Sequence, residues 1–153
     1  MSDPLREQIA QALLVKLQGV TRAGGYNTDL GLHVSRRRKA ITDYLAGDLP
    51  AVALFSGERP ASDPLLGRGG TTHQGVIEFV ALAVVESEEP DRDVNLVEAD
   101  LLKALLGDED LGTLRVNVRD AGSATDYAEY APQGRGFVQL HLAVDYWWTH
   151  AAP

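Results

Sequence analysis

The sequence predicts an α+β domain of two layers, a mostly antiparallel or mixed sheet with two helices packed on one face. Two segments repeat apolar residues at three- and four-residue spacing, which is typical of amphipathic helices. Other segments are apolar stretches bounded by Pro and Gly, as strands are. The predicted order is helix, strands, helix, strands, and this order disfavours a doubly wound parallel sheet because strands and helices do not alternate regularly.

Length and composition indicate one domain over residues 1–153. A chain of 153 residues fits the roughly 100–200 residues of a typical domain. Its 44% hydrophobic and 24% charged residues are close to the globular average. The absence of Cys excludes disulfides, thiolate nucleophiles and Cys-based metal sites.

The charge and the apolar segments bear on location and partners. The start MSDPLREQ has no export-signal pattern, and Val76–Val85 is shorter than the roughly 18 residues of a membrane span. We therefore expect a soluble protein made in the cytoplasm. The net charge of −8 argues against tight wrapping of nucleic acid, since phosphates bind Lys and Arg. An acidic surface is compatible with a channel through which DNA passes without binding.

The first helix is predicted from Leu5 to Leu17, with Ser2 or Asp3 as the cap and Pro4 in the first turn. Gly19 is a natural stop. The pattern over 24–48 is weaker and predicts a short strand or hairpin. Residues 50–57, PAVALFSG, predict a compact apolar strand.

The middle of the chain combines a long loop with a long strand. Residues 58–75 are rich in Gly and Pro and exceed the usual loop length, which is typical of functional or disordered segments. The strand predicted from Val76 to about Ser87 is apolar on both faces except for Glu78. Such a strand is expected to be central and covered on both sides.

The second half predicts a helix and further strands. The acidic turn 86–93 precedes a helix with apolar residues from Val94 to Leu105, ending at Gly107, and its carboxylates suit the positive end of the helix dipole. A short strand over 114–118, a polar Gly-containing connection and a short strand near 127–130 follow. The last predicted strand runs from Phe137 to Trp148.

Catalytic and metal-binding motifs are absent from the sequence. The metalloprotease, hydrolase, P-loop and dinucleotide-binding patterns do not occur. The four histidines are not spaced as a metal pair on one helix would be. They are His33, His73, His141 and His150. We expect no enzyme, no metal and no cofactor. The less favoured alternative is a small enzyme or ligand-binding domain that uses His73 or His141 with nearby carboxylates.

Three charged clusters are candidate surfaces. Arg36, Arg37 and Arg38, with the following Lys39, could bind phosphate or an acidic partner, although we favour a solvated face. The acidic residues over 86–93 are explained by the helix start. Asp108, Glu109 and Asp110 follow the second helix at the unfavourable end of its dipole, so either a solvated turn or a channel wall accounts for them.

The final strand ends in consecutive aromatic residues, Tyr146, Trp147 and Trp148. In an extended strand Tyr146 and Trp148 face one side and Trp147 the other. A two-layer domain buries only one of these sides under its helices, and aromatic residues are enriched at interfaces. A partner surface and an aromatic cap over the sheet edge both stay open as interpretations.

Several stretches, in this order, resemble the tail terminator family of lambda-type bacteriophages, the minor tail protein U group. The resemblance covers most of the chain. It is carried by REQIAQALLVKL, PAVALFSGE, the Gly/Pro-rich loop, QGVIEFVALAVVES, NLVEADLLKALL and GFVQLHLAVDYWW. The segment GGYNTDLGLHVSRRR also looks like one found in such proteins, but it makes this chain longer than the shortest members.

The resemblance implies a structural protein of the virion tail, from a phage or prophage. Its subunits would form a ring, expected to be a homohexamer, that caps the tail tube protein, stops tube polymerisation and meets the head–tail joining protein. Trp147, Trp148 and the loop 58–75 would then contribute contacts, and Asp108–Asp110 would line the DNA passage. The alternative within the same context is another head–tail connector or minor tail assembly protein.

Overall fold

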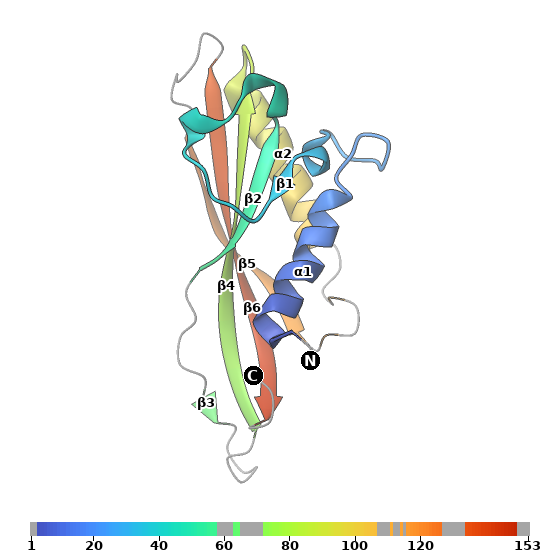
Figure 1. The fold of residues 1–153 in the computed structure, drawn as a ribbon, viewed down its shortest axis with the longest axis vertical. Helices are drawn as coiled ribbons and strands as arrows, with labels where there is room; N and C mark the ends of the chain where they lie inside the picture. Colours follow the sequence, from blue (N-terminus) through green and yellow to red (C-terminus); the bar gives the residue numbers. More distant parts are fainter. Residues whose placement is uncertain are drawn as a thin grey trace.

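The computed structural model describes residues 3–57, 63–64, 72–106, 111, 114, 116–126 and 134–149. Two α-helices, short 3-10 turns and six strands form an elongated α+β structure (Figure 1). The helices are α1 (Leu5–Gln18) and α2 (Pro90–Leu106). The strands are β1 (Val34–Ser35), β2 (Ala51–Ser56), β3 (Asp63–Pro64), β4 (Thr72–Glu86), β5 (Val116–Asp126) and β6 (Arg135–Thr149).

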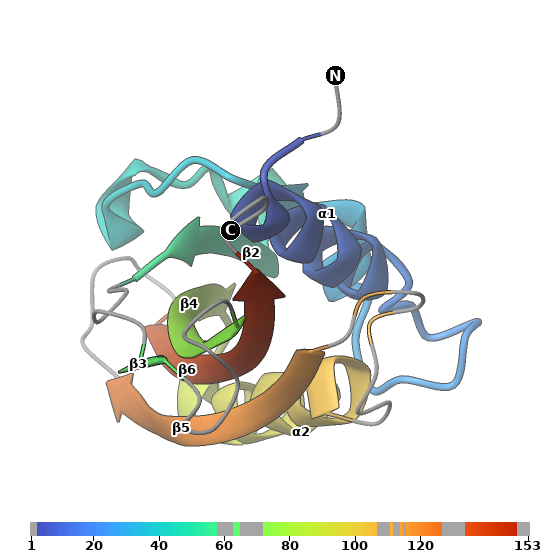
Figure 2. The same ribbon diagram turned by 90° about the horizontal axis from the view of Figure 1, so that it is seen from below.

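The strands form one mixed sheet in the order β1-β2-β4-β6-β5. Only β1 is parallel to its neighbour, and the other pairs are antiparallel. The short β3 pairs with the first residues of β4, beyond the end of β2. Strands β4 and β6 pair over their full 15 residues, from Thr72–Thr149 to Glu86–Arg135. Seen from below, the sheet is curled, with α1 beside β2 and α2 beside β5 (Figure 2).

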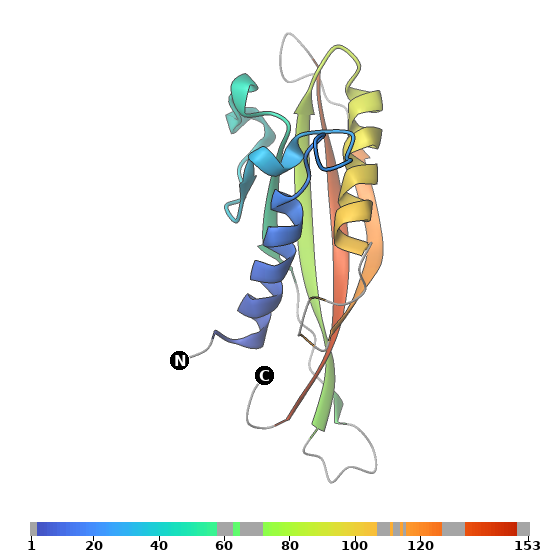
Figure 3. The same ribbon diagram turned by 90° about the vertical axis from the view of Figure 1, so that its right-hand side faces the viewer.

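Both helices pack on the same side of the sheet, as predicted (Figure 3). Helix α1 contacts β1, β2 and α2, and α2 contacts β4, β5 and β6. The main core lies between these two layers. Its largest fully buried side chains include Ile9, Leu13, Leu17, Leu54, Phe79, Leu101, Leu105, Leu140, Leu142 and Tyr146.

The sheet face away from the helices, which we call the outer face, is covered near one end by a described segment. There the segment 40–49 packs Tyr44, with Ile41 and Leu49 beside it, onto Ala51 and Val84. Arg135 helps to hold this segment, since its Nη1 donates a hydrogen bond to the Ile41 carbonyl at 2.7 Å. Its Nε lies 3.5 Å from Glu86 Oε1, an ion pair without hydrogen-bond geometry. The prediction that the strand from Val76 to about Ser87 is central is confirmed, and near Val84 it is covered on both sides. Its cover on the outer face is not continuous, since the Glu78 side chain is about a third exposed there.

Several local predictions need correction. Pro4 occupies the N-cap of α1, and no side chain caps the helix. Over 24–48, where a short strand or hairpin was predicted, the short strand is confirmed as β1 and no hairpin forms. The rest of this segment is built of turns and the 3-10 helices Leu30–Leu32, Ile41–Asp43 and Ala46–Asp48. Gly107 and the strand predicted near 127–130 lie outside the described residues.

Strand β5 is longer than predicted because a bulge replaces the expected connection. The pairing shifts by one residue between Asp120, opposite Leu142, and Ser123, opposite Leu140. Gly122 adopts φ +101°, which favours glycine, and its N–H donates to Asp120 Oδ1 at 2.8 Å. The polar Gly-containing residues therefore continue the strand instead of ending it.

A buried carboxylate that the sequence did not reveal fixes the loop after α1. Asp100 of α2 is 1% exposed and accepts hydrogen bonds from Asn27 N at 2.9 Å, Thr28 N at 2.8 Å and Thr28 Oγ1 at 2.7 Å. Nearby, Lys103 Nζ donates to the Gly25 carbonyl at 3.0 Å and lies 4.7 Å from the centre of the Tyr26 ring. These contacts attach residues 25–28 to the surface of α2.

Replacement of Asp100 by Asn is expected to lower the free energy of unfolding by about 1–3 kcal/mol, because an amide cannot accept from all three donors and leaves a buried donor unsatisfied. Urea unfolding of Asp100→Asn measures this change. Asp91→Asn, an exposed carboxylate in the first turn of the same helix, is the control and should change stability by only a few tenths of a kcal/mol. Equal stabilities of the two variants would contradict this role.

Gly75 lets Tyr146 lie flat on the neighbouring strand. The two residues are paired across β4 and β6, and Tyr146 is 2% exposed on the helix side. A Cβ at position 75 would lie 2.5 Å from Tyr146 Oη and 2.6 Å from Cζ. The Tyr146 ring can be buried at this position because Gly75 has no side chain.

Gly75→Ala is expected to destabilise the fold by about 1–3 kcal/mol, because a buried ring held in the core cannot move aside cheaply. Gly47→Ala is the matched control, since a Cβ there meets nothing within 4 Å. Thermal unfolding followed by circular dichroism compares the two variants. A melting temperature for Gly75→Ala equal to that of Gly47→Ala would refute the packing argument.

Candidate interface on the outer face of the sheet

The outer face changes character along the length of β4 and β6. Near Ala51 and Val84 it is apolar and covered, whereas from Glu78 toward the start of β4 it carries charged and aromatic side chains that no described element covers. Because side chains alternate along paired strands, every second residue of β4, β6 and β5 lies on this face. In this region these residues are Val76, Glu78 and Val80 of β4, His141, Ala143, Asp145 and Trp147 of β6, and Asn117 and Arg119 of β5.

A histidine–carboxylate contact and an ion pair cross the strands in this region. His141 Nδ1 lies 2.7 Å from Glu78 Oε1, and each side chain is about a third exposed. Arg119 binds Asp145 through two hydrogen bonds, from Nε at 2.6 Å and Nη2 at 2.9 Å. The hydrogen bonds to Asp145, with its charge, raise the pKa of the Arg119 guanidinium above its ordinary value. Both pairs orient their side chains along the sheet and leave the surface open to solvent.

The aromatic end of β6 is divided between the two faces. Trp147 is 44% exposed on the outer face, opposite Gln74 of β4. Tyr146 is in the core, so its predicted place in an interface is wrong for the folded subunit, because the helix layer and Gly75 already enclose the ring. The side chain of Trp148 lies outside the described residues. Trp147 is therefore the aromatic residue that the described structure offers to a partner.

The described residues neutralise the basic run after β1 only in part. Arg36 Nη1 donates to Glu7 Oε1 at 2.9 Å, and this hydrogen bond, with a second from Gln11, lowers the pKa of the Glu7 carboxyl below its ordinary value. Arg37 is exposed. Arg38 and Lys39 lie over aromatic rings, 5.3 Å from the centre of Phe55 and 5.4 Å from that of Tyr44.

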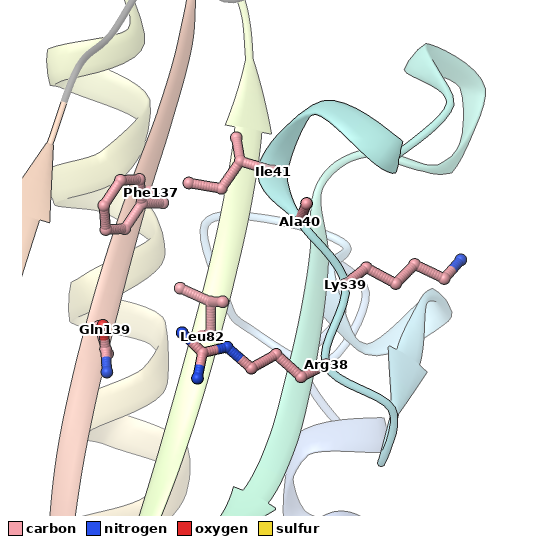
Figure 4. A pocket seen from close by; sticks show the side chains of 7 residues that line it. All are labelled: Arg38, Lys39, Ala40, Ile41, Leu82, Phe137 and Gln139. Carbon is pink, nitrogen blue, oxygen red and sulfur yellow. The ribbon is translucent and has the colours of Figure 1, made fainter.

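Arg38 also borders a groove of about 490 Å³ on the outer face (Figure 4). Leu82 of β4, Phe137 of β6 and Ile41 form its apolar walls, and Gln139 adds an amide. In Figure 4 the Arg38 side chain extends over β4 toward Leu82, whereas Lys39 points to the opposite side. The groove thus combines an apolar floor with one inward-pointing cation.

The structure brings together some of the predicted site residues and leaves others untested. His141 and Glu78 form the carboxylate–histidine contact that the enzyme hypothesis required, but on an open strand surface. His33 is exposed, and the side chains of His73 and His150 are outside the described residues. Asp108, Glu109 and Asp110 also lie outside them, as does most of the loop 58–75.

Within the described part of the chain, no group of three or more metal-binding side chains is close enough to hold an ion. None of the helices in that part has the length and apolar character needed to cross a membrane. No protein-family model matches the chain, and no curated protein matches it.

Replacement of Arg36 by Ala is expected to raise the pKa of Glu7 toward its ordinary value, because the hydrogen bond that lowers it most is lost. A pH titration of the Glu7 side-chain carboxyl by NMR measures the change. Arg37→Ala, which removes an adjacent cation with no contact to Glu7, should leave the titration as in the wild type. The ion pair would be refuted if Glu7 titrated identically in Arg36→Ala and the wild type.

Proposed function

We propose that this protein is a phage or prophage tail terminator, a structural subunit that forms a ring on the end of the tail tube. The supporting observation is the exposed Trp147 on a sheet face that no described element covers. Tryptophan and arginine are enriched at protein–protein contacts, and Trp147 lies on the same face as Arg119. The sequence resemblance supplies the kind of assembly in which that contact would be made.

Two features of the fold are compatible with a ring. A closed ring of identical subunits uses two different patches in head-to-tail contact. Strand β5 has β6 on one side and no described strand on the other, so its outer edge offers backbone hydrogen-bonding groups. The outer face near Trp147 is a second, different patch. A hexamer remains the expected ring size.

In this role the subunits would stop tube growth and present a surface to the head–tail joining protein. DNA would pass through the ring without binding specifically, in keeping with the net charge of −8. Work of this kind needs no catalytic group, so the proposal includes that the protein is not an enzyme and acts within the virion tail. Another role at the head–tail junction is the alternative.

Trp147→Ala is expected to weaken self-assembly by at least tenfold, because central interface tryptophans commonly contribute more than 1–2 kcal/mol, as a rough guide. Native mass spectrometry and sizing across a concentration series measure this. Val15→Ala, an exposed apolar residue on α1, is the matched control and should assemble as the wild type does. An assembly state unchanged by Trp147→Ala would count against the proposed contact.

Electron microscopy of particles that lack this protein tests the function itself. A terminator predicts overlong tails, because tube polymerisation would not be stopped. Normal tails that fail to join heads would instead assign the protein to the connector. Normal infectious particles would reject both roles.

A further inference from the structure

The groove beside Arg38 places a cation next to apolar side chains. Its walls are fixed: Phe137 and Leu82 belong to paired central strands, and the Ile41 carbonyl is bound by Arg135. Arg38 is positioned over the Phe55 ring. A carboxylate that entered the groove would therefore meet a guanidinium held in place beside apolar side chains.

The cations around this groove have no acidic partner in the part of the chain that the structure describes. Among the described residues, no carboxylate forms an ion pair with Arg37, Arg38 or Lys39. By contrast, Arg36 and Arg135 are each paired with a carboxylate. In a chain of net charge −8, three adjacent unpaired cations mark a local region of opposite charge.

The complementary surface is present on the same chain but on the other side of the sheet. Glu88, Glu89 and Asp91 are exposed where β4 leads into α2, and no described cation pairs with them. Pro90 lies between them and packs against Gly134. Helix α2 packs on the inner side of the sheet, whereas the groove residues of β4 and β6 face outward.

We infer that the Arg38 groove of one copy receives the acidic turn 88–91 of a second copy. The two surfaces are different, so a copy that uses its groove keeps its acidic turn for a further copy, and the contact can repeat head-to-tail. A chain of such contacts closes into a ring if the rotation per subunit permits. This inference rests on the proposed ring and identifies which charged surfaces meet in it.

Two complementary charge-reversal variants test the contact. The groove variant carries Arg37→Glu and Arg38→Glu, and the turn variant carries Glu89→Arg and Asp91→Arg. Each alone should lose wild-type assembly in native mass spectrometry and sizing. Their equimolar mixture should assemble again into a complex of 1:1 composition, because each groove then meets a turn of opposite charge on the other variant. This complex should dissociate as salt is raised, since exposed charges are screened.

A chain that carries all four reversals should assemble again, and Arg22→Glu, which reverses an exposed cation away from the groove, should behave as the wild type. Formation of the 1:1 complex also shows that both variants are folded. Wild-type rings from either variant alone would overturn the contact and leave the terminator role standing. A mixture that stays monomeric would overturn it as well. A 1:1 complex, with normal tails on particles lacking the protein, would support the contact and reject the terminator role.

Discussion

The unbroken antiparallel pairing of β4 with β6 determines how the rest of the molecule is arranged. Fifteen residues in each strand span about 50 Å at roughly 3.3 Å per residue. Helix α1, with 14 residues, and α2, with 17, span only about 21 and 26 Å at 1.5 Å per residue. The two helices lie side by side on one face, so they cannot cover the whole ribbon, and its far end projects past them (Figure 1).

The outer face lies on the side of the sheet opposite both helices, so the helices do not cover it. At one end the segment 40–49 shields apolar residues around Val84, and Arg135 fastens that segment to the sheet. Toward the other end the side chains become charged or amphipathic, and the Glu78–His141 and Arg119–Asp145 pairs keep them hydrogen-bonded without a covering layer. Trp147 is exposed in this uncovered region. A surface that is partly apolar and that no described element covers can bind another protein. The proposed function relies on this surface for that reason.

The signals in the sequence that mark helix and strand limits are local. The limits of α1, β2, β4 and β6 were predicted within a few residues, because hydrophobic period and Pro or Gly boundaries report each element directly. The sequence analysis predicted a connecting loop where the structure has a bulge at Gly122. A glycine among polar residues is typical of both a β-bulge and a loop between strands, so the local pattern does not distinguish them. Asp100 was missed because its partners, Asn27 and Thr28, are more than 70 positions away in the chain. Gly75 was missed for the same reason, as its partner is Tyr146.

By itself the sequence determined the α+β class, the positions of the long strands and helices, and the absence of any motif for catalysis or metal binding. It also determined that Tyr146 and Trp147 face opposite sides, because successive side chains alternate along a strand. Only the tertiary structure decided which of the two is buried, since that depends on the side of the sheet on which the helices pack. It likewise decided that Arg38 borders a groove while Arg36 pairs with Glu7. Burial and ion pairing are set by residues distant in the chain, and no local pattern records them.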